Sequence, residues 1–136
     1  MTLLIWLNSL MPADVSSVQS EFIVGIINDL FDWLGMSIDQ SLLSTIVRKL
    51  AHFIEFTVLG YLYFNISFNR NNKNNFVLAI SLGIIVAIID ECIQLFVDGR
   101  AFMLTDIGID SFGVITGSLI GLLIYSLVKK KNINID

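Results

Sequence analysis

The chain has 136 residues, of which 55% are hydrophobic and 15% are charged, and its formal net charge is −4. A mean hydropathy of +0.79 is too high for a soluble domain of this size and is typical of a membrane protein. The negative charge leaves no basic surface for nucleic acid, so we expect no nucleic-acid partner. The single cysteine, Cys92, excludes an intrachain disulfide and a cysteine-based metal site.

The first third of the sequence predicts half a membrane span followed by a surface helix. Residues 1–10 are apolar, but a span requires roughly 20 residues, so we expect the end of a first transmembrane helix or a re-entrant segment. Residues 11–19 are polar and predict a turn. Ser20 then fits a helix N-cap, and residues 20–35 place apolar side chains on one side and acidic ones on the other. This pattern predicts an amphipathic helix on the membrane surface, with a lid over a polar site as the alternative.

Residues 41–69 predict the first complete span, although this segment contains several charged side chains. Arg48, His52 and Glu55 are spaced i, i+4 and i+7, which puts them on one helical stripe about 60° wide. Charged groups inside a membrane are costly, and they face a bundle interior, a water-filled cavity or the interface. The stripe therefore predicts a polar column that meets side chains of other helices.

Residues 76–97 predict the second span, which is apolar until three polar residues near its end: Asp90, Glu91 and Gln94. A short connection follows, with a turn signal at Asp98-Gly99 and then Arg100.

Residues 105–128 predict the third span, with Thr105 as its N-cap. Asp106 and Asp110 share a stripe with three glycines at a spacing of four, namely Gly113, Gly117 and Gly121. Small residues at this spacing let membrane helices approach closely, so we expect the stripe to pack against a neighbouring helix.

These segments predict an all-α, polytopic membrane helix bundle that forms a single domain. It has three complete spans, a partial first span and an outer amphipathic helix. Lysine and arginine are enriched in cytoplasmic loops. Arg70 and Lys73 between the first two complete spans, and Lys129 to Lys131 after the last, therefore predict a cytoplasmic C-terminus in the cell membrane. The polar residues of the spans then face the outside.

The polar residues of three predicted spans fall at one depth. Their convergence predicts a ligand-binding cluster that consists of Arg48, His52, Glu55, Asp90, Glu91, Gln94, Arg100, Asp106 and Asp110. Helix capping, and pairs such as Arg48 with Glu55 or Arg100 with Asp98, would explain single members but not the convergence.

Charge balance predicts the arrangement of this cluster. Carboxylates that share a site without water cannot all carry charge cheaply, so a shared proton, a bound cation or a cationic ligand group must meet the excess. We expect His52 and Glu55 to face Glu91 and Asp110, with Arg48 at the outer mouth. Lys49 and Arg100 are expected to reach water, and Asp106 lies at the rim.

Several motifs resemble the VanZ-like family of bacterial membrane proteins. They are RKLAHFIEFTVLGYL and DECIQLFVDGRAFMLTDIGIDSFGVITG, with H-x-x-E, D-E-x-x-Q-x-F, G-R and D-x-x-x-D-x-x-G in this order, and SLMPADVSSVQS near the start. The resemblance covers about Asn8 to Tyr125, and it implies that the chain starts inside the family's first helix. The family's named member is linked to low-level teicoplanin resistance, so the resemblance implies a role in the cell envelope.

Three functions follow from the cluster and the resemblance. In the first, the protein binds a membrane lipid, a lipid-linked cell-wall precursor or a glycopeptide, and Arg48, Lys49 and Arg100 contact phosphate. The alternative is a membrane-embedded enzyme in which His52 is general acid or base, Glu55 orients it, and Glu91 or Asp110 is a second base or metal ligand. A proton-coupled transporter is the third.

The motifs leave the enzymatic alternative open without supporting a cofactor. The sequence contains no nucleophile motif and no zinc pattern such as H-E-x-x-H, so we expect no cofactor and no resident metal. A homo-oligomer is compatible with all three functions.

Overall fold

The computed structural model describes residues 1–11, 13–36, 39–67 and 74–133, and within them it contains five α-helices and no strand. The helices are α1 (Thr2–Ser9), α2 (Ala13–Trp33), α3 (Gln40–Ser67), α4 (Asn74–Gln94) and α5 (Leu104–Ile133). The predicted all-α class is confirmed. Two segments, Phe76–Gln94 and Leu104–Lys130, are long and apolar enough to cross a membrane. Helix α3 has 28 residues, which is also enough to span, but it carries the polar stripe.

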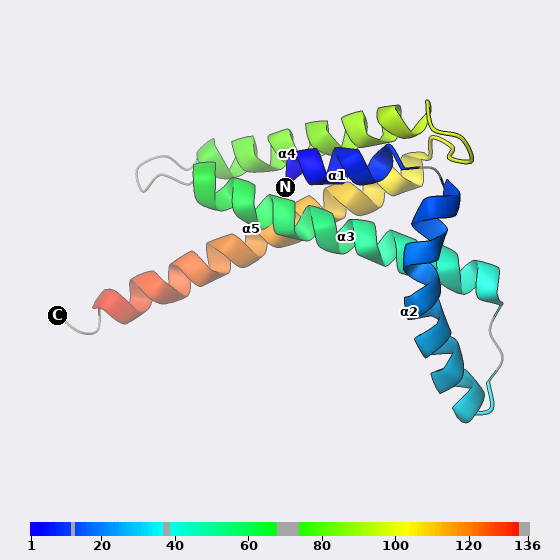
Figure 1. Cartoon of the computed structure of the whole chain (residues 1–136). Helices are drawn as coiled ribbons and strands as arrows, with labels where there is room; N and C mark the ends of the chain where they lie inside the picture. Colours follow the sequence, from blue (N-terminus) through cyan, green and yellow to red (C-terminus); the bar gives the residue numbers. More distant parts are fainter. Residues whose placement is uncertain (12, 37–38, 68–73, 134–136) are drawn as a thin grey trace.

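Helix α3 is the centre of the bundle and packs against α2, α4 and α5. Figure 1 shows α1 lying beside α4, while α5 crosses α3 and extends toward the C-terminus at the far end. Buried side chains from four helices form the core between them: Ile5, Phe56, Leu59, Val86, Ala87 and Val114. These apolar side chains fix the helix positions and thereby fix where the polar residues meet.

The glycine stripe of α5 faces α3, as predicted. A Cβ atom at Gly113 would lie 2.7 Å from the carbonyl oxygen of Phe53, and one at Gly117 would meet the carbonyl oxygen of Thr57. Ser118, next to the stripe, donates a hydrogen bond of 3.3 Å to the carbonyl oxygen of Gly60. Only glycine permits this backbone-to-backbone approach, so the stripe sets the α3–α5 distance.

Helix α2 begins at Ala13, so the prediction of a turn at residues 11–19 and a helix start at Ser20 is wrong. The preference of serine and aspartate for caps and turns is worth only a few tenths of a kcal/mol per residue, which does not stop a helix. Proline is the residue of this stretch that opposes a helix strongly, and Pro12 precedes Ala13 in the sequence.

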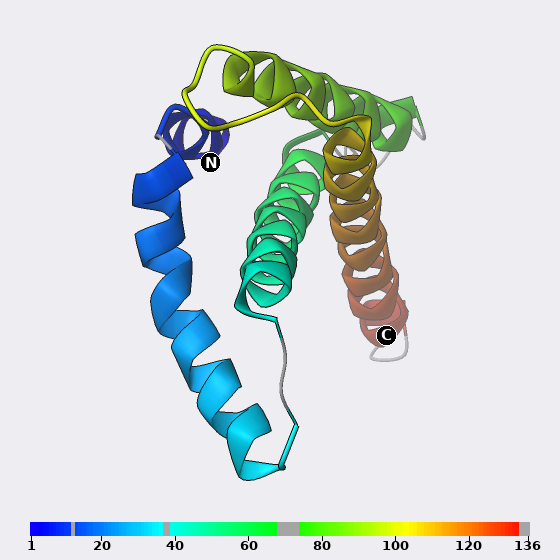
Figure 2. The same cartoon turned by 90° about the vertical axis from the view of Figure 1, so that its right-hand side faces the viewer.

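Helix α2 leaves the bundle after a contact with the start of α3. Val24 packs against Leu43 and Val47, and Figures 1 and 2 show α2 running across the direction of α1 and α4 and diverging from α3. Several of its other apolar side chains are exposed, including Phe22 at 76% and Trp33 at 81%. These side chains have no protein cover within the described residues, which fits a membrane-surface helix; that location remains a prediction.

The turn at Asp98-Gly99 is confirmed, since Gly99 has a φ of 76° and Arg100 donates its backbone N–H to the carbonyl of Val97. This turn follows the end of α4 at Gln94, so the helix stops before the predicted end at residue 97. Helix α5 begins at Leu104, so Thr105 lies inside its first turn and is not an N-cap. The side chain of Thr105 is instead hydrogen-bonded to Asp106 over 3.2 Å.

Part of the sequence prediction lies outside the described residues. The loop with Arg70 and Lys73 belongs to residues 68–73, and nothing can be added about it or about the side chain of Lys131. The cytoplasmic location of the C-terminus therefore stays a prediction.

Candidate functional site

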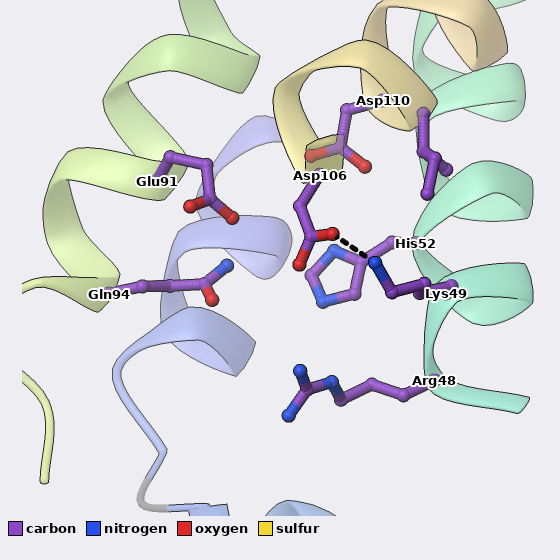
Figure 3. Close-up of a pocket in the computed structure, with 8 residues that line it drawn as sticks. Arg48, Lys49, His52, Glu91, Gln94, Asp106 and Asp110 are labelled. Carbon is purple, nitrogen blue, oxygen red and sulfur yellow. Dashed lines mark hydrogen bonds and ion pairs between the residues drawn. The ribbon is translucent and has the colours of Figure 1, made fainter. Parts of the chain in front are cut away.

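A polar pocket lies at one end of the bundle, where α3, α4 and α5 meet. Its lining residues are Arg48, Lys49, His52, Glu91, Gln94, Asp106, Ile109 and Asp110. Figure 3 shows the first three coming from α3, Glu91 and Gln94 from α4, and the two aspartates from α5. Most of the predicted site residues are thus brought together, although their role as ligand-binding groups stays a prediction.

Asp90 lies directly beside this pocket and is completely buried. Its Oδ1 atom accepts a hydrogen bond of 2.6 Å from the Ser9 hydroxyl, and its Oδ2 atom accepts one of 3.1 Å from the Gln94 amide. One donor comes from α1 and the other from one turn further along α4. The side chain of Asp90 is therefore held in one orientation by two helices.

Other buried polar atoms of the pocket have no partner within the described residues. Asp110 is 1% exposed, and neither of its carboxyl oxygens accepts a hydrogen bond. Glu91 accepts a 2.8 Å hydrogen bond from the backbone N–H of Met103 through Oε2, while its Oε1 atom has no partner. The Nδ1 atom of His52 is also unpartnered. Buried polar groups normally have partners because leaving them bare costs about 1–3 kcal/mol each, so these atoms are candidate contacts for a ligand.

Lys49 and Asp106 form an ion pair of 2.6 Å between α3 and α5 (Figure 3). The sequence does not predict this ion pair; from it we expect Lys49 to reach water and Asp106 to lie at the rim. The two side chains are only 27% and 18% exposed, so the pair closes one wall of the pocket. The pairs of Arg48 with Glu55 and of Arg100 with Asp98, which the alternative explanation by simple pairing would require, do not form in the described structure.

Glu55 does not line the pocket, although its charge still acts on Asp110, so its expected place opposite Glu91 and Asp110 stays a prediction. Its Oε1 atom accepts a hydrogen bond of 3.1 Å from the side-chain amide of Asn8 on α1. Glu55 and His52 share a helical stripe, but α1 lies beside this part of the bundle and provides Asn8 as the nearest donor. The angular spacing along α3 does not reveal which neighbour covers each turn.

Two neighbouring guanidinium groups, Arg48 of the pocket lining and Arg100 close to it, form no ion pair with a carboxylate in the described structure. Arg48 makes no ion pair with any side chain of the described segments. Arg100, in the loop after α4, donates a hydrogen bond of 3.4 Å to the carbonyl oxygen of Asn8. Burial lowers the pKa of Arg100, and repulsion from Arg48 lowers it further, whereas Asp90 and Glu91 oppose this change. Two neighbouring cations that lack a partner favour a bound anion.

An apolar groove adjoins the pocket along α3 and α5. It has a volume of about 690 Å³ and is lined by Ile46, Lys49, Leu50, Phe53, Thr105, Gly108, Ile109 and Phe112. Lys49 and Ile109 line both the groove and the pocket, so the two spaces are adjacent. The free space inside the polar pocket is only about 10 Å³, which is about the room that one water molecule needs.

Comparison with known proteins decides the family. The family model described as VanZ/LLP1 matches residues 1–128, which include every residue that lines the pocket and the groove. The chain belongs to the VanZ/LLP1 family. No curated protein and no solved structure gives a match. Family membership confirms the resemblance in the sequence motifs, and together with two apolar helices of spanning length it supports a membrane protein.

The site of this VanZ/LLP1 protein also contains residues that its sequence does not point out. Ser9 and Asn8 are polar residues at the end of an apolar segment, and that position was the only sign of their role. They contact Asp90, Glu55 and Arg100. The arrangement therefore combines a cationic entrance, buried acceptor atoms without partners and an apolar groove.

Proposed function

We propose that this VanZ-family protein is a multi-pass protein of the cell membrane that binds an amphiphile with a phosphate headgroup. The class of ligand is a lipid-linked cell-wall precursor, and binding lowers susceptibility to glycopeptide antibiotics of the teicoplanin type. The observation that supports this function is the adjacency of the polar pocket and the apolar groove, which share Lys49 and Ile109.

The groove suits the hydrocarbon part of such a ligand. Its volume of about 690 Å³ lies in the range of small-molecule sites, and its walls are mainly aliphatic and aromatic. Phe53 and Phe112 both line the groove and stack on one another with ring centroids 5.8 Å apart, so α3 and α5 contribute to one apolar wall. A chain bound here lies against the outside of the bundle and stays continuous with membrane lipid.

The headgroup would bind at the entrance of the pocket, not inside it. The interior has room for about one water molecule, which is too little for a phosphate group. Arg48 and Arg100 offer guanidinium groups that can bind phosphate oxygens in a bidentate manner. Neither group forms an ion pair with a carboxylate in the described structure, and a bound anion would offset the repulsion between them.

The location of the pocket fits the site of glycopeptide action. In the proposed topology α3, α4 and α5 span the membrane, α2 lies on the outer surface and the C-terminus is cytoplasmic. The end of α4 at Gln94 and the start of α5 at Leu104 then lie on the outer side, and the pocket with them. Glycopeptides act on cell-wall precursors on that side of the membrane.

Teicoplanin susceptibility of a host with and without the gene tests the function. We expect the wild-type protein to raise the inhibitory concentration, and Arg48→Gln to abolish the increase because the headgroup loses a cation. Lys129→Gln, at the distant end of α5, is the matched control and should keep it. Equal resistance from Arg48→Gln and wild type at equal protein level would contradict the proposal.

Binding by the purified protein separates this function from a general effect on the membrane. The probe is an undecaprenyl-type lipid phosphate, compared with the same lipid alcohol. We expect the phosphate to bind at least about tenfold more tightly, which corresponds to about 1.4 kcal/mol. Equal affinity for the two lipids would show that the arginines do not recognise the headgroup.

The unpartnered atoms of His52 and Asp110 favour the alternative of an enzyme that acts on a lipid-linked headgroup. His52 would act as general acid or base next to the bound phosphate. Turnover of a lipid-linked precursor by the purified protein, lost in His52→Ala, would favour this alternative. Binding without turnover would leave the non-enzymatic function.

A further inference from the structure

We propose that His52, Asp90 and Asp110 form a binding site for one divalent transition-metal cation, of the type of Zn²⁺ or Mn²⁺. The three residues come from α3, α4 and α5, and each offers a ligand atom such that all three atoms lie within 4.8 Å of one another. This site lies deeper than the arginines of the pocket entrance. It does not depend on the lipid ligand proposed above.

The spacing of the three ligand atoms suits a small cation. Nitrogen and carboxylate ligands bind such ions at about 2.0–2.2 Å, so neighbouring ligands of a tetrahedral site are about 3.4 Å apart. The observed atoms, which lie within 4.8 Å of one another, therefore have to close by up to about 1.4 Å around the ion, which side-chain rotation can supply. The adjacent pocket space of about 10 Å³ holds one small ion or one water molecule and excludes larger ligands.

Unpartnered acceptor atoms point to a cation, not to a structural cluster of carboxylates. Asp110 is 1% exposed, lines the pocket and has two oxygens without any hydrogen bond in the described structure. The Nδ1 atom of His52, on the same pocket, is unpartnered as well. A bare carboxylate that is buried must be neutralised, since an isolated buried charge is far too costly.

No basic side chain of the described residues forms an ion pair with Asp90 or Asp110, although the Arg100 guanidinium acts on Asp90 from a greater distance. Lys49 is paired with Asp106, and Arg100 donates to the carbonyl oxygen of Asn8. Arg48 lies one helical turn before His52, and it makes no ion pair within the described segments. A divalent cation between Asp90 and Asp110 supplies positive charge in direct contact with both carboxylates.

The surroundings of Asp90 resemble the support that metal ligands require. The hydroxyl of Ser9 and the amide of Gln94 each donate to a different oxygen of Asp90 and fix the carboxylate in place. Outer contacts of this kind orient metal ligands, and their loss weakens metal binding about 10- to 100-fold. The free Oε1 atom of Glu91 lies on the same pocket and can accept a hydrogen bond from a metal-bound water.

The donor set selects the class of metal. Imidazole prefers zinc, copper, iron and nickel, whereas carboxylates prefer magnesium, calcium and manganese, so a mixed site of one imidazole and two carboxylates suits Zn²⁺ or Mn²⁺. This proposal differs from the prediction from sequence that no resident metal is present. No linear motif reveals this site because its ligands belong to three different helices.

Metal content of the purified chain tests the site. The full chain in detergent is stripped of metal with a chelator, loaded with Zn²⁺ or Mn²⁺ and desalted. Its metal content is then measured by elemental mass spectrometry. We expect about one ion per chain in the wild type, and at least a 100-fold loss of affinity in Asp110→Asn and His52→Gln. Ser9→Ala should lose about 10- to 100-fold, as is usual for an outer contact. Asp98→Asn, the same chemical change in the exposed loop after α4, should bind like the wild type.

Thermal unfolding separates loss of the ion from loss of the fold. Metal should raise the melting temperature of the wild type and of Asp98→Asn, because an ion that binds only the folded state stabilises it. Without metal, Asp110→Asn should have the same melting temperature as the metal-free wild type or a higher one, because the substitution removes a buried charge. Addition of metal should not raise the melting temperature of this variant. If Asp110→Asn does not fold, His52→Gln and Ser9→Ala decide by the same two measurements. A folded wild type that retains neither ion, or folded ligand variants that retain it equally, would overturn the proposal.

Discussion

Replacing Gly117 with leucine should force helices α3 and α5 apart. A Cβ atom at this position would meet the carbonyl oxygen of Thr57 and would lie 2.7 Å from the backbone nitrogen of Tyr61. Both atoms belong to the backbone of α3, so they cannot turn away as a flexible side chain could. Because α3 and α5 share the most extensive helix–helix contact among the described residues, and they cross near the middle of the bundle (Figure 1), the core is affected.

The neighbouring Gly113 sets the scale of this effect. Its added Cβ would lie 2.7 Å from the carbonyl oxygen of Phe53, whereas an ordinary carbon–oxygen contact is about 3.3 Å or longer. One methyl group therefore requires a shift of about 0.6 Å. Overpacking of this kind costs about 1–3 kcal/mol, and alanine regains up to about 1 kcal/mol in helix propensity, so Gly113→Ala should destabilise by about 0–2 kcal/mol. Gly117→Leu, with a closer approach and a larger side chain, should cost about 3 kcal/mol or more.

The matched control is Gly108→Leu on the same helix. A Cβ at Gly108 meets no atom within 4 Å. Leucine there changes hydrophobicity and helix propensity by the same amount as leucine at Gly117, but it creates no clash. The measurement is the fraction of monodisperse protein in detergent together with its melting temperature. A loss of about 3 kcal/mol lowers the ratio of folded to unfolded protein by about 100-fold. Equal yield and melting temperature for the two variants would refute the close approach of α5 to α3.

Three other predictions follow from the site and the topology. Gly108→Leu should keep the fold but weaken binding of a lipid phosphate by about tenfold or more, since the new side chain projects into the apolar groove; unchanged affinity would place the ligand elsewhere. In a background without the native cysteine, an outside thiol reagent should label Phe102→Cys but not Asn132→Cys, and the reverse pattern would reject the proposed orientation. Glu91→Gln should abolish resistance in a folded protein because Glu91 lines the pocket, whereas Glu55→Gln can keep its hydrogen bond to α1 and should retain resistance; the opposite result would contradict the site.

The sequence predicts the helices and the general place of the site well. Segments 41–69, 76–97 and 105–128 are close to α3, α4 and α5, because long apolar runs leave few alternatives to a helix. The packing of α5 against a neighbouring helix was also predictable, since three glycines at a spacing of four form a continuous flat surface on α5. Polar residues in apolar helices have to avoid lipid, so their convergence at one end of the bundle follows from their depth.

The pairing of individual charges cannot be predicted from the same information. Lys49 lies one position from Arg48, yet it is Lys49 that reaches Asp106 across the helix interface. Glu55 shares a stripe with His52, but its neighbour is Asn8. Helical spacing gives an angle on one helix, whereas a hydrogen bond depends on where a second helix lies along it. The start of α2 was missed for a different reason, because the cap preferences of single residues are small beside the free energy of a continuous helix.

Helix α1 contributes contacts to the site that the sequence does not indicate. It has only 8 residues and contributes to the apolar core through Ile5. Its last turn nevertheless contacts three of the residues predicted to bind a ligand, through Ser9 and through the side chain and backbone of Asn8. Ser9 and Asn8 are adjacent, so they connect Asp90 on α4, Glu55 on α3 and the loop residue Arg100. The buried carboxylates and the cationic entrance are therefore linked through one short helix, and a shift of α1 would change both together.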